Sequence, residues 1–200
     1  MVATKNAHKV VELQRILMAR EEFGAAVELA SLAAFPGAPD VAETGCTFEE
    51  NALLKARAVA AFTGLPAIAD DSGLCVDALN GMPGVLSARW AGRHGDDDAN
   101  LRLVLDQVAD VPPGRRGARF ICAAALVAGS AERVAEGRLE GRLTTSPRGH
   151  NGFGYDPIFV PEGEERTTAE MAPQEKDAIS HRGRAFRALA PVIAEVLALP

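Results

Sequence analysis

Apolar residues recur along the chain with the period of an α-helix in four segments. In residues 9–17 they return every three or four positions and form one apolar helical face. The same spacing predicts further helices over residues 47–64, 95–110 and 180–199. The first of these three has clear boundaries, because Thr47 and Glu50 match a capping box and Gly64 is a typical C-terminal stop.

Shorter apolar runs between the predicted helices indicate β-strands. These runs cover residues 1–4, 26–31, 66–74, 118–129, 132–143 and 158–160, and residues 74–79 either continue the third strand or pair beside it. A Gly-Ser turn joins the two longest runs, which indicates an antiparallel hairpin. Because strands alternate with helices around this hairpin, the pattern predicts an α/β fold with a mixed sheet in two lobes.

The composition is that of an ordinary globular protein. Of the 200 residues, 48% are hydrophobic, which is enough for one large domain or for two lobes that share a cleft. The formal net charge of −6 argues against nucleic-acid binding. No apolar run approaches the roughly 20 residues that span a bilayer, and no leader opens the chain, so neither membrane insertion nor secretion is expected. Three cysteines without CxxC spacing favour free thiols in a cytoplasmic protein.

Two adjacent carboxylates follow an apolar run in "PAIADDSGL", residues 66–74. Like charges repel and carboxylates are costly to desolvate, so something must offset the cost of Asp70 and Asp71. A hard cation would do so, since Mg²⁺ takes one or two carboxylates and completes its shell with water and phosphate oxygens. We expect the strand to end at these acids, with Ser72 and Gly73 in a tight turn. The alternative interpretation is a polar strand end with an Asx-turn.

Two other segments carry candidate phosphate-binding or acidic groups. "ATKNAHK" places Asn6 in a strand-to-helix turn and Lys9 in the first helical turn, an arrangement that suits a phosphate. Glu43 precedes the capped helix, in which Asn51 and Lys55 are four residues apart and share a face. Taken alone, these segments are explained more simply as a helix cap and a solvated surface.

The C-terminal third of the chain contains a glycine-rich loop and a cluster of donors. "GHNGFGYDP" carries Phe153 and Tyr155, which suit stacking on a flat base, or else pack a hydrophobic turn onto the core. The donors surround the start of the last helix: Lys176, Ser180, His181 and Arg182. A Ser-His-Asp hydrolase is disfavoured, because Ser72 lacks the sharp elbow that such a nucleophile needs.

Five blocks of the sequence together resemble the inosine triphosphate pyrophosphatase family, whose members hydrolyse noncanonical purine nucleoside triphosphates. The blocks are "ATKNAHK", "ETGCTFEENALLKA", "ADDSGLCVDAL", "GFGYDPIF" and "EKDAISHRGRA", in the order and spacing of that family. The resemblance covers residues 3–190. Only two residues precede the first block, fewer than the family's first strand usually has, so either this strand is trimmed or the true start lies upstream.

The resemblance implies one elongated α/β domain over residues 1–200, with two lobes around a central substrate cleft, and a homodimer. It implies hydrolysis of a nucleoside triphosphate to the monophosphate and pyrophosphate, dependent on Mg²⁺. Glu43 and Asp71 would hold the metal, and Asp71 would accept the proton of the attacking water. The residues implied to bind substrate are Thr4, Lys5, Asn6, Ala7, His8, Lys9, Lys55, Ser72, Phe153, Gly154, Tyr155, Asp156, Lys176, His181 and Arg182.

Base selectivity is expected at residues 180–182. Inosine and xanthine carry a 6-oxo group where adenine carries a 6-amino group, so donors aimed at position 6 accept the first two and reject the third. Arg182 is the candidate donor, together with the free N–H groups at the start of the last helix. Two alternatives stay open: a house-cleaning pyrophosphatase for modified pyrimidine nucleotides, and a non-catalytic nucleotide-binding module.

Overall fold

The structure is a computed structural model that describes residues 1–4, 7–19, 23, 29–32, 35 and 37–197. The chain divides into two compact units. Unit 1 comprises Met1–Asp71, Cys122–Gly137 and His181–Pro200, and unit 2 comprises Ser72–Ile121 and Arg138–Ser180. Among the described residues, no helix is long and apolar enough to cross a membrane.

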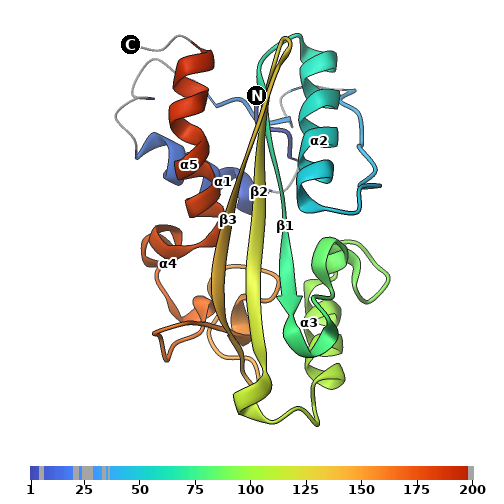
Figure 1. The fold of residues 1–200 in the computed structure, drawn as a ribbon, viewed down its shortest axis with the longest axis vertical. Helices are drawn as coiled ribbons and strands as arrows, with labels where there is room; N and C mark the ends of the chain where they lie inside the picture. Colours follow the sequence, from blue (N-terminus) through green and yellow to red (C-terminus); the bar gives the residue numbers. More distant parts are fainter. Residues whose placement is uncertain (5–6, 20–22, 24–28, 33–34, 36, 198–200) are drawn as a thin grey trace. The chain divides into compact units, whose positions relative to one another are not determined.

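Four strands form one sheet in the order β1–β2–β3–β4. They are β1 (Ala67–Val76), β2 (Gly117–Ala128), β3 (Ala131–Leu143) and β4 (Phe159–Pro161). A two-residue turn joins β2 to β3, and its Gly129 has φ +58°, a value that glycine adopts readily (Figure 1). β4 pairs antiparallel with the end of β3, with Gly141 opposite Pro161. The predicted hairpin and the predicted α/β class are therefore confirmed.

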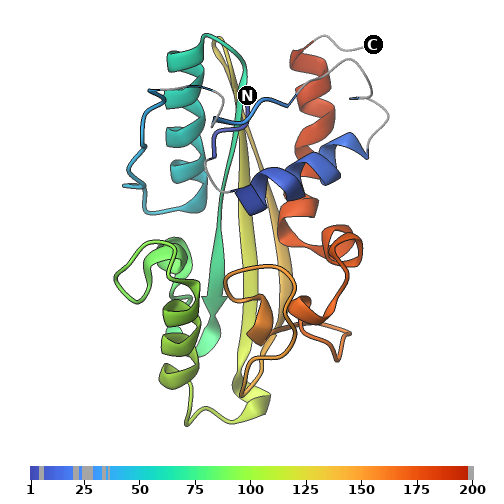
Figure 2. The ribbon, with the colours of Figure 1, turned by 180° about the vertical axis from the view of Figure 1, so that it is seen from behind.

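Unit 1 packs three helices against the two faces of its part of the sheet. Helices α1 (Ala7–Met18) and α5 (His181–Val196) lie side by side on one face, and α2 (Phe48–Thr63) covers the other (Figures 1 and 2). Side chains alternate along a strand, so Ile68 packs with α1 and α5 whereas Ala67 and Ala69 pack with α2. Consecutive residues of β1 thus face different helices.

Helix α2 begins and ends where the sequence predicts. The Thr47 hydroxyl accepts from the backbone N–H of Glu50 at 3.1 Å, and the Glu50 carboxylate accepts from the backbone N–H of Thr47 at 3.2 Å. Gly64 ends the helix with φ +68°. A capping interaction of this kind stabilises a helix by about 1 kcal/mol, and it fixes the first turn of α2, which carries Asn51.

Unit 2 has its own core, built from β1, β2, β3, β4 and helix α3 (Asp97–Gln107) and centred on Leu74, Val104, Phe120 and Phe159. The Asp96 side chain caps α3 by accepting from the backbone N–H of Ala99 at 3.2 Å, as its position in the sequence suggests. This unit also contains a short helix, α4 (Pro173–Ile179), which the periodicity did not reveal because it spans only seven residues.

Strand β1 does not end at the paired acids, and the turn expected at Ser72 and Gly73 is wrong. The strand continues to Val76, so "LCV" extends it. Gly73 serves a close approach rather than a turn, because a Cβ there would overlap the Gly84 carbonyl and the Ser87 hydroxyl. At the N-terminus, Val2 forms single bridges to Ser31 and Ile68, while residues 26–28 of the strand expected at 26–31 lie outside the described residues.

Candidate active site

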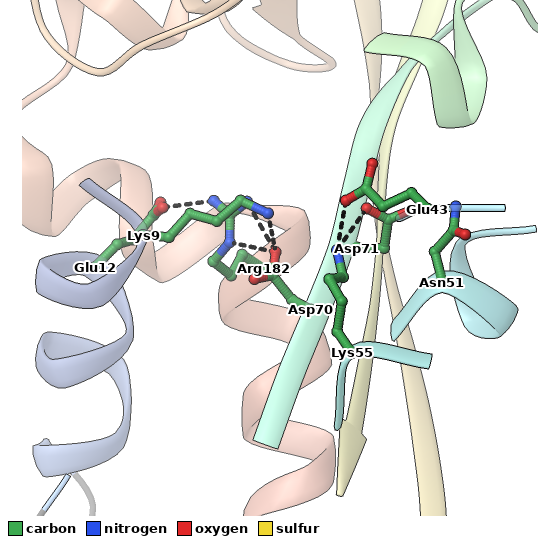
Figure 3. Close-up of polar contacts among 8 residues, drawn as sticks. All are labelled: Lys9, Glu12, Glu43, Asn51, Lys55, Asp70, Asp71 and Arg182. Carbon is green, nitrogen blue, oxygen red and sulfur yellow. Dashed lines mark hydrogen bonds and ion pairs between the residues drawn. The ribbon is translucent and has the colours of Figure 1, made fainter. Parts of the chain in front are cut away.

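The paired acids of β1 point to opposite faces of the sheet (Figure 3). Asp70 faces α1 and α5, and Asp71 faces α2, because successive side chains of a strand alternate. Each carboxylate has its own cations: Lys9 and Arg182 on one face and Lys55 on the other. The expectation that one cation offsets the charge of both acids is therefore corrected.

Asp70 lies in a buried ion-pair network. Its Oδ2 accepts from Lys9 Nζ at 3.0 Å and from Arg182 Nε and Nη2 at 3.2 Å each. Arg182 Nη1 donates to Glu12 Oε2 at 2.5 Å, so one guanidinium joins α5 to both β1 and α1. Burial alone would raise the pKa of Asp70, but the positive charges of Lys9, Arg182 and Lys55 hold it well below its usual range.

Asp71 lies in a second cluster, around the ammonium group of Lys55. Lys55 Nζ is 2.9 Å from Glu43 Oε1 and 3.0 Å from Asp71 Oδ1, while Asn51 Nδ2 donates to Asp71 Oδ2 at 3.1 Å (Figure 3). Burial raises the pKa of Asp71, and the charge of Glu43 adds to this rise against the opposing effect of Lys55. For Lys55, burial acts to lower the pKa, but the surrounding carboxylates outweigh it and raise the value.

The Glu43–Asp71 pair has the chemistry of a site for a hard divalent cation. Both side chains offer carboxylate oxygens to one positive group, the Lys55 ammonium, from a loop and from a strand. The residues that the structure describes contain no cluster of three or more acidic, histidine or cysteine side chains that could enclose a metal. Mg²⁺ does not require one, because it binds through one or two carboxylates and takes its other ligands from water and phosphates. The pair therefore fits Mg²⁺.

Unit 2 holds the other predicted binding residues around the buried carboxylate of Asp156. Asp156 Oδ2 accepts from Lys176 Nζ at 2.6 Å and from the backbone N–H of Phe153 at 2.8 Å, and Oδ1 accepts from the Thr168 hydroxyl at 2.8 Å. Lys176 Nζ also lies 5.2 Å from the centre of the half-buried Phe153 ring. The carboxylate thus fixes both the turn that carries Phe153 and the lysine beside it.

The neighbours of Phe153 in the glycine-rich loop are tied to the rest of unit 2. The Gly154 N–H donates to Asp97 Oδ2 at 2.9 Å, at the start of α3. The buried Tyr155 hydroxyl donates to the Ser87 carbonyl at 2.8 Å. Burial raises the pKa of this phenol, so Tyr155 remains a neutral donor. Its contacts make Tyr155 an internal anchor of the loop.

The remaining predicted site residues lie near the start of the chain, in β1 and at the start of α5. Lys5 and Asn6 lie outside the described residues, Thr4 precedes α1, and Ala7 and His8 are described only as its first two helical residues. Ser72 lies within β1, and His181 is buried as the first residue of α5. The structure thus brings Glu43, Lys55 and Asp71 together on one face of the sheet and Lys9 and Arg182 together on the other, all in unit 1. In unit 2 it brings Phe153–Asp156 together with Lys176.

Three partners of the site were missing from the predicted set: Glu12, Asn51 and Thr168. The sequence did carry a signal for Asn51, because it lies four residues before Lys55 on the same helical face. Glu12 is buried, and its contact with the distant Arg182 could not be read from the local sequence. No local pattern indicates Thr168, whose partner is 12 residues away.

Comparison with known proteins agrees with the resemblance found in the sequence. The chain belongs to the Ham1 family, whose sequence model matches residues 1–192. It is 60% identical to the dITP/XTP pyrophosphatase of Streptomyces coelicolor over 98% of both chains, and 54% identical to that of Mycobacterium tuberculosis over 96% of this chain and 94% of the relative. Two solved structures are similar. A nucleoside-triphosphatase / dITP/XTP pyrophosphatase from Mycobacterium abscessus is 57% identical with a TM-score of 0.76, and the match covers 95% of this chain and 97% of that one. A HAM1 protein from Coxiella burnetii is 44% identical with a TM-score of 0.85, and the match covers 97% of each chain.

Proposed function

We propose that this protein hydrolyses noncanonical purine nucleoside triphosphates, namely ITP, dITP and XTP, to the monophosphate and pyrophosphate, and so removes them from the nucleotide pool. The observation that carries the proposal is the cluster of Glu43, Lys55 and Asp71, in which two carboxylates from separate segments share one ammonium group. The names of the relatives that match the chain over nearly its whole length support the same activity.

Asp71 is proposed as the group that accepts the proton of the attacking water. The water forms a bond to the α-phosphorus, the bond from that phosphorus to the bridging oxygen breaks, and pyrophosphate leaves. A carboxylate is an effective general base when its pKa is raised towards the working pH, and burial raises the pKa of Asp71. Its neighbour Lys55 keeps the carboxylate oriented through a 3.0 Å contact.

Glu43 and Asp71 are proposed to hold Mg²⁺. When bound, the metal neutralises phosphate oxygens and lowers the pKa of a bound water. The chain adds positive charge of its own, because Lys9 and Lys55 are both held in place by carboxylates of β1. In phosphoryl transfer such positioning and electrostatic stabilisation account for most of the catalysis.

On the family resemblance, Phe153 and Lys176 of unit 2 and His181 and Arg182 of unit 1 are each proposed to contact the nucleoside. The Phe153 ring is held by the Asp156 carboxylate through its backbone and offers a surface for base stacking. His181 and Arg182 begin α5, and the resemblance implies that they contact the base. The same resemblance implies that these residues and Glu43, Lys55 and Asp71 contact one substrate.

The resemblance also leads us to propose that the protein is a homodimer and acts in the cytoplasm. Cys46, Cys75 and Cys122 are all free thiols, which is typical of proteins in a reducing compartment. Sedimentation equilibrium gives the oligomeric state directly. A monomer at micromolar concentration contradicts the first part of this proposal, and a purified protein with intermolecular disulfides contradicts the second.

The test of the activity is the release of pyrophosphate from ITP by the wild-type protein and by Asp71→Asn. The substitution preserves shape but removes the charge that accepts a proton, so we expect kcat to fall by about 10²- to 10⁴-fold. The exposed Asp110→Asn is the matched control and should keep wild-type activity. EDTA, which removes Mg²⁺, should abolish pyrophosphate release by the wild-type protein. Equal activity of Asp71→Asn and wild type contradicts the role of Asp71, and a base panel that favours modified pyrimidines contradicts the substrate.

A further inference from the structure

Asn51 connects the strand and the loop that supply the two carboxylates of the active-site cluster. It lies near the start of α2 and is completely buried on the face that packs against the sheet. Its Nδ2 donates to Asp71 Oδ2 at 3.1 Å, and both residues are drawn in Figure 3. Its Oδ1 accepts from the backbone N–H of Gly45 at 2.8 Å. One amide group thus joins β1 to the loop that carries Glu43.

The two donors of α2 contact different oxygens of the same carboxylate. Lys55 donates to Asp71 Oδ1 and Asn51 donates to Asp71 Oδ2, from positions one helical turn apart. A single hydrogen bond leaves a carboxylate able to rotate about its Cβ–Cγ bond, whereas two bonds to opposite oxygens fix that rotation. Asn51 therefore determines the direction in which the oxygens of Asp71 present their remaining lone pairs.

The other half of the amide fixes the loop. A Cβ at Gly45 would lie 2.8 Å from Asn51 Oδ1 and 2.6 Å from the Glu50 Cβ, so the loop backbone approaches α2 as closely as glycine allows. Gly45 is two residues after Glu43. The hydrogen bond from Gly45 to Asn51 consequently limits how far the Glu43 backbone can move from Asp71.

Only a side chain with both a donor and an acceptor can make these two contacts. An aspartate at position 51 could still accept from the Gly45 N–H, but its second oxygen would face the Asp71 carboxylate and repel it. An alanine would lose both contacts. The aspartate substitution therefore keeps the hydrogen bond that supports the loop and removes the one that orients Asp71, whereas the alanine substitution removes both.

We infer that Asn51 is a positioning residue for the hydrolysis proposed above, acting through Asp71 and the Glu43 loop. The inference rests on the proposed function, because Asn51 has no role in catalysis unless Asp71 has one. A misplacement of about 1 Å at a reacting group can lower the rate about 10²-fold. We expect Asn51→Ala and Asn51→Asp to lower kcat by about 10- to 100-fold and to change KM by less than about threefold.

The experiment compares kcat and KM for ITP, at saturating Mg²⁺, among wild type, Asn51→Ala and Asn51→Asp. A purely structural role in holding the loop predicts that Asn51→Asp keeps kcat, because the aspartate still accepts from Gly45. A positioning role predicts that Asn51→Asp is at least as slow as Asn51→Ala. Thermal unfolding of each variant, followed by circular dichroism, shows whether the fold is retained.

Asn100→Asp is the matched control. Asn100 is also buried on a helix and accepts from a backbone N–H, that of Ala91, at 2.7 Å. Its Nδ2 has no hydrogen-bond partner within the part of the chain that the structure describes, so the substitution buries the same new charge without removing a contact to a carboxylate. We expect this variant to keep kcat within about twofold of wild type.

Each outcome decides the inference. It is overturned if Asn51→Asp keeps kcat within twofold of wild type, or if Asn100→Asp loses as much kcat as Asn51→Asp. If Asn51→Asp does not fold, Asn51→Ala decides, and a raised KM with unchanged kcat overturns the inference. Asp71→Asn, measured in parallel, separates the two proposals: full activity there refutes both, whereas an inactive Asp71→Asn with an active Asn51→Asp refutes only the role of Asn51.

Discussion

Arg182 has a structural role that its position in the sequence does not reveal. Its buried guanidinium compensates two buried carboxylates, those of Asp70 and Glu12. Removing one partner of a buried ion pair leaves an uncompensated charge, which costs about 3–5 kcal/mol. We therefore expect Arg182→Ala to lower the free energy of unfolding by about this amount, measured by urea denaturation. The exposed Arg184→Ala should change it by less than about 0.5 kcal/mol.

The result for Arg182→Ala also bears on base selection. If Arg182 donates to the 6-oxo group, the ratio of kcat/KM for ITP to that for ATP should fall in the fraction of the variant that is folded. If Arg182 acts only through its ion pairs, the two substrates should lose activity equally. A variant that is as stable as wild type contradicts the structural role, whatever its activity.

At the scale of single residues, the sequence predicts chemistry better than orientation. The resemblance assigns Glu43, Lys55 and Asp71 to the site, and the structure places them within hydrogen-bonding distance of one another. The sequence could not show that Asp70 faces away from Asp71, because the expected turn concealed the alternation of a continuous strand. It also could not pair Glu12 with Arg182, since a contact between residues 170 positions apart depends on the packing of α1 against α5.

At the scale of elements, β3 and α5 approach each other closely at Gly137. A Cβ at this position would overlap the backbone of His181 and Ala185 in the first turns of α5. Backbone atoms cannot move aside as a flexible side chain can, so Gly137→Ala should lower the free energy of unfolding by about 1–3 kcal/mol, measured by urea denaturation. Gly114→Ala is the control, because nothing lies within 4 Å of its Cβ and its φ is not positive. Equal stability of the two variants contradicts the close approach.

The elements were predictable where local signals mark them. The capping box at Thr47, the stop at Gly64 and the turn at Gly129 are all chemical signals within a few residues, and each lies where it was expected. The end of β1 was misplaced because its continuation depends on partners far along the chain. Gly73 looks like a turn residue in the sequence, but it is required by the backbone of Gly84, 11 residues later.

At the scale of the whole molecule, the proposed reaction fixes which bond breaks. If Asp71 directs water to the α-phosphorus, hydrolysis of ITP in ¹⁸O-labelled water should place the label in the monophosphate and leave the pyrophosphate unlabelled. Phosphorus NMR measures the label through its isotope shift. Label in pyrophosphate, or release of single phosphate, contradicts attack at this position. Wild type in unlabelled water gives the reference spectrum.

Because Asp70 and Asp71 point to opposite faces of the sheet, the site depends on the number of residues that precede them in β1. Inserting one residue ahead of Asp70, with the rest of β1 kept in register, would turn every later side chain to the other face. Asp70 would then take the place of Asp71 beside Lys55, and the residue before it would take the place beside Lys9 and Arg182, which would lose their carboxylate. Two inserted residues would restore the facing but shift the acids along the strand by about 6.6 Å. A change in the number of residues ahead of Asp70 should therefore break the buried ion pairs of Lys9 and Arg182.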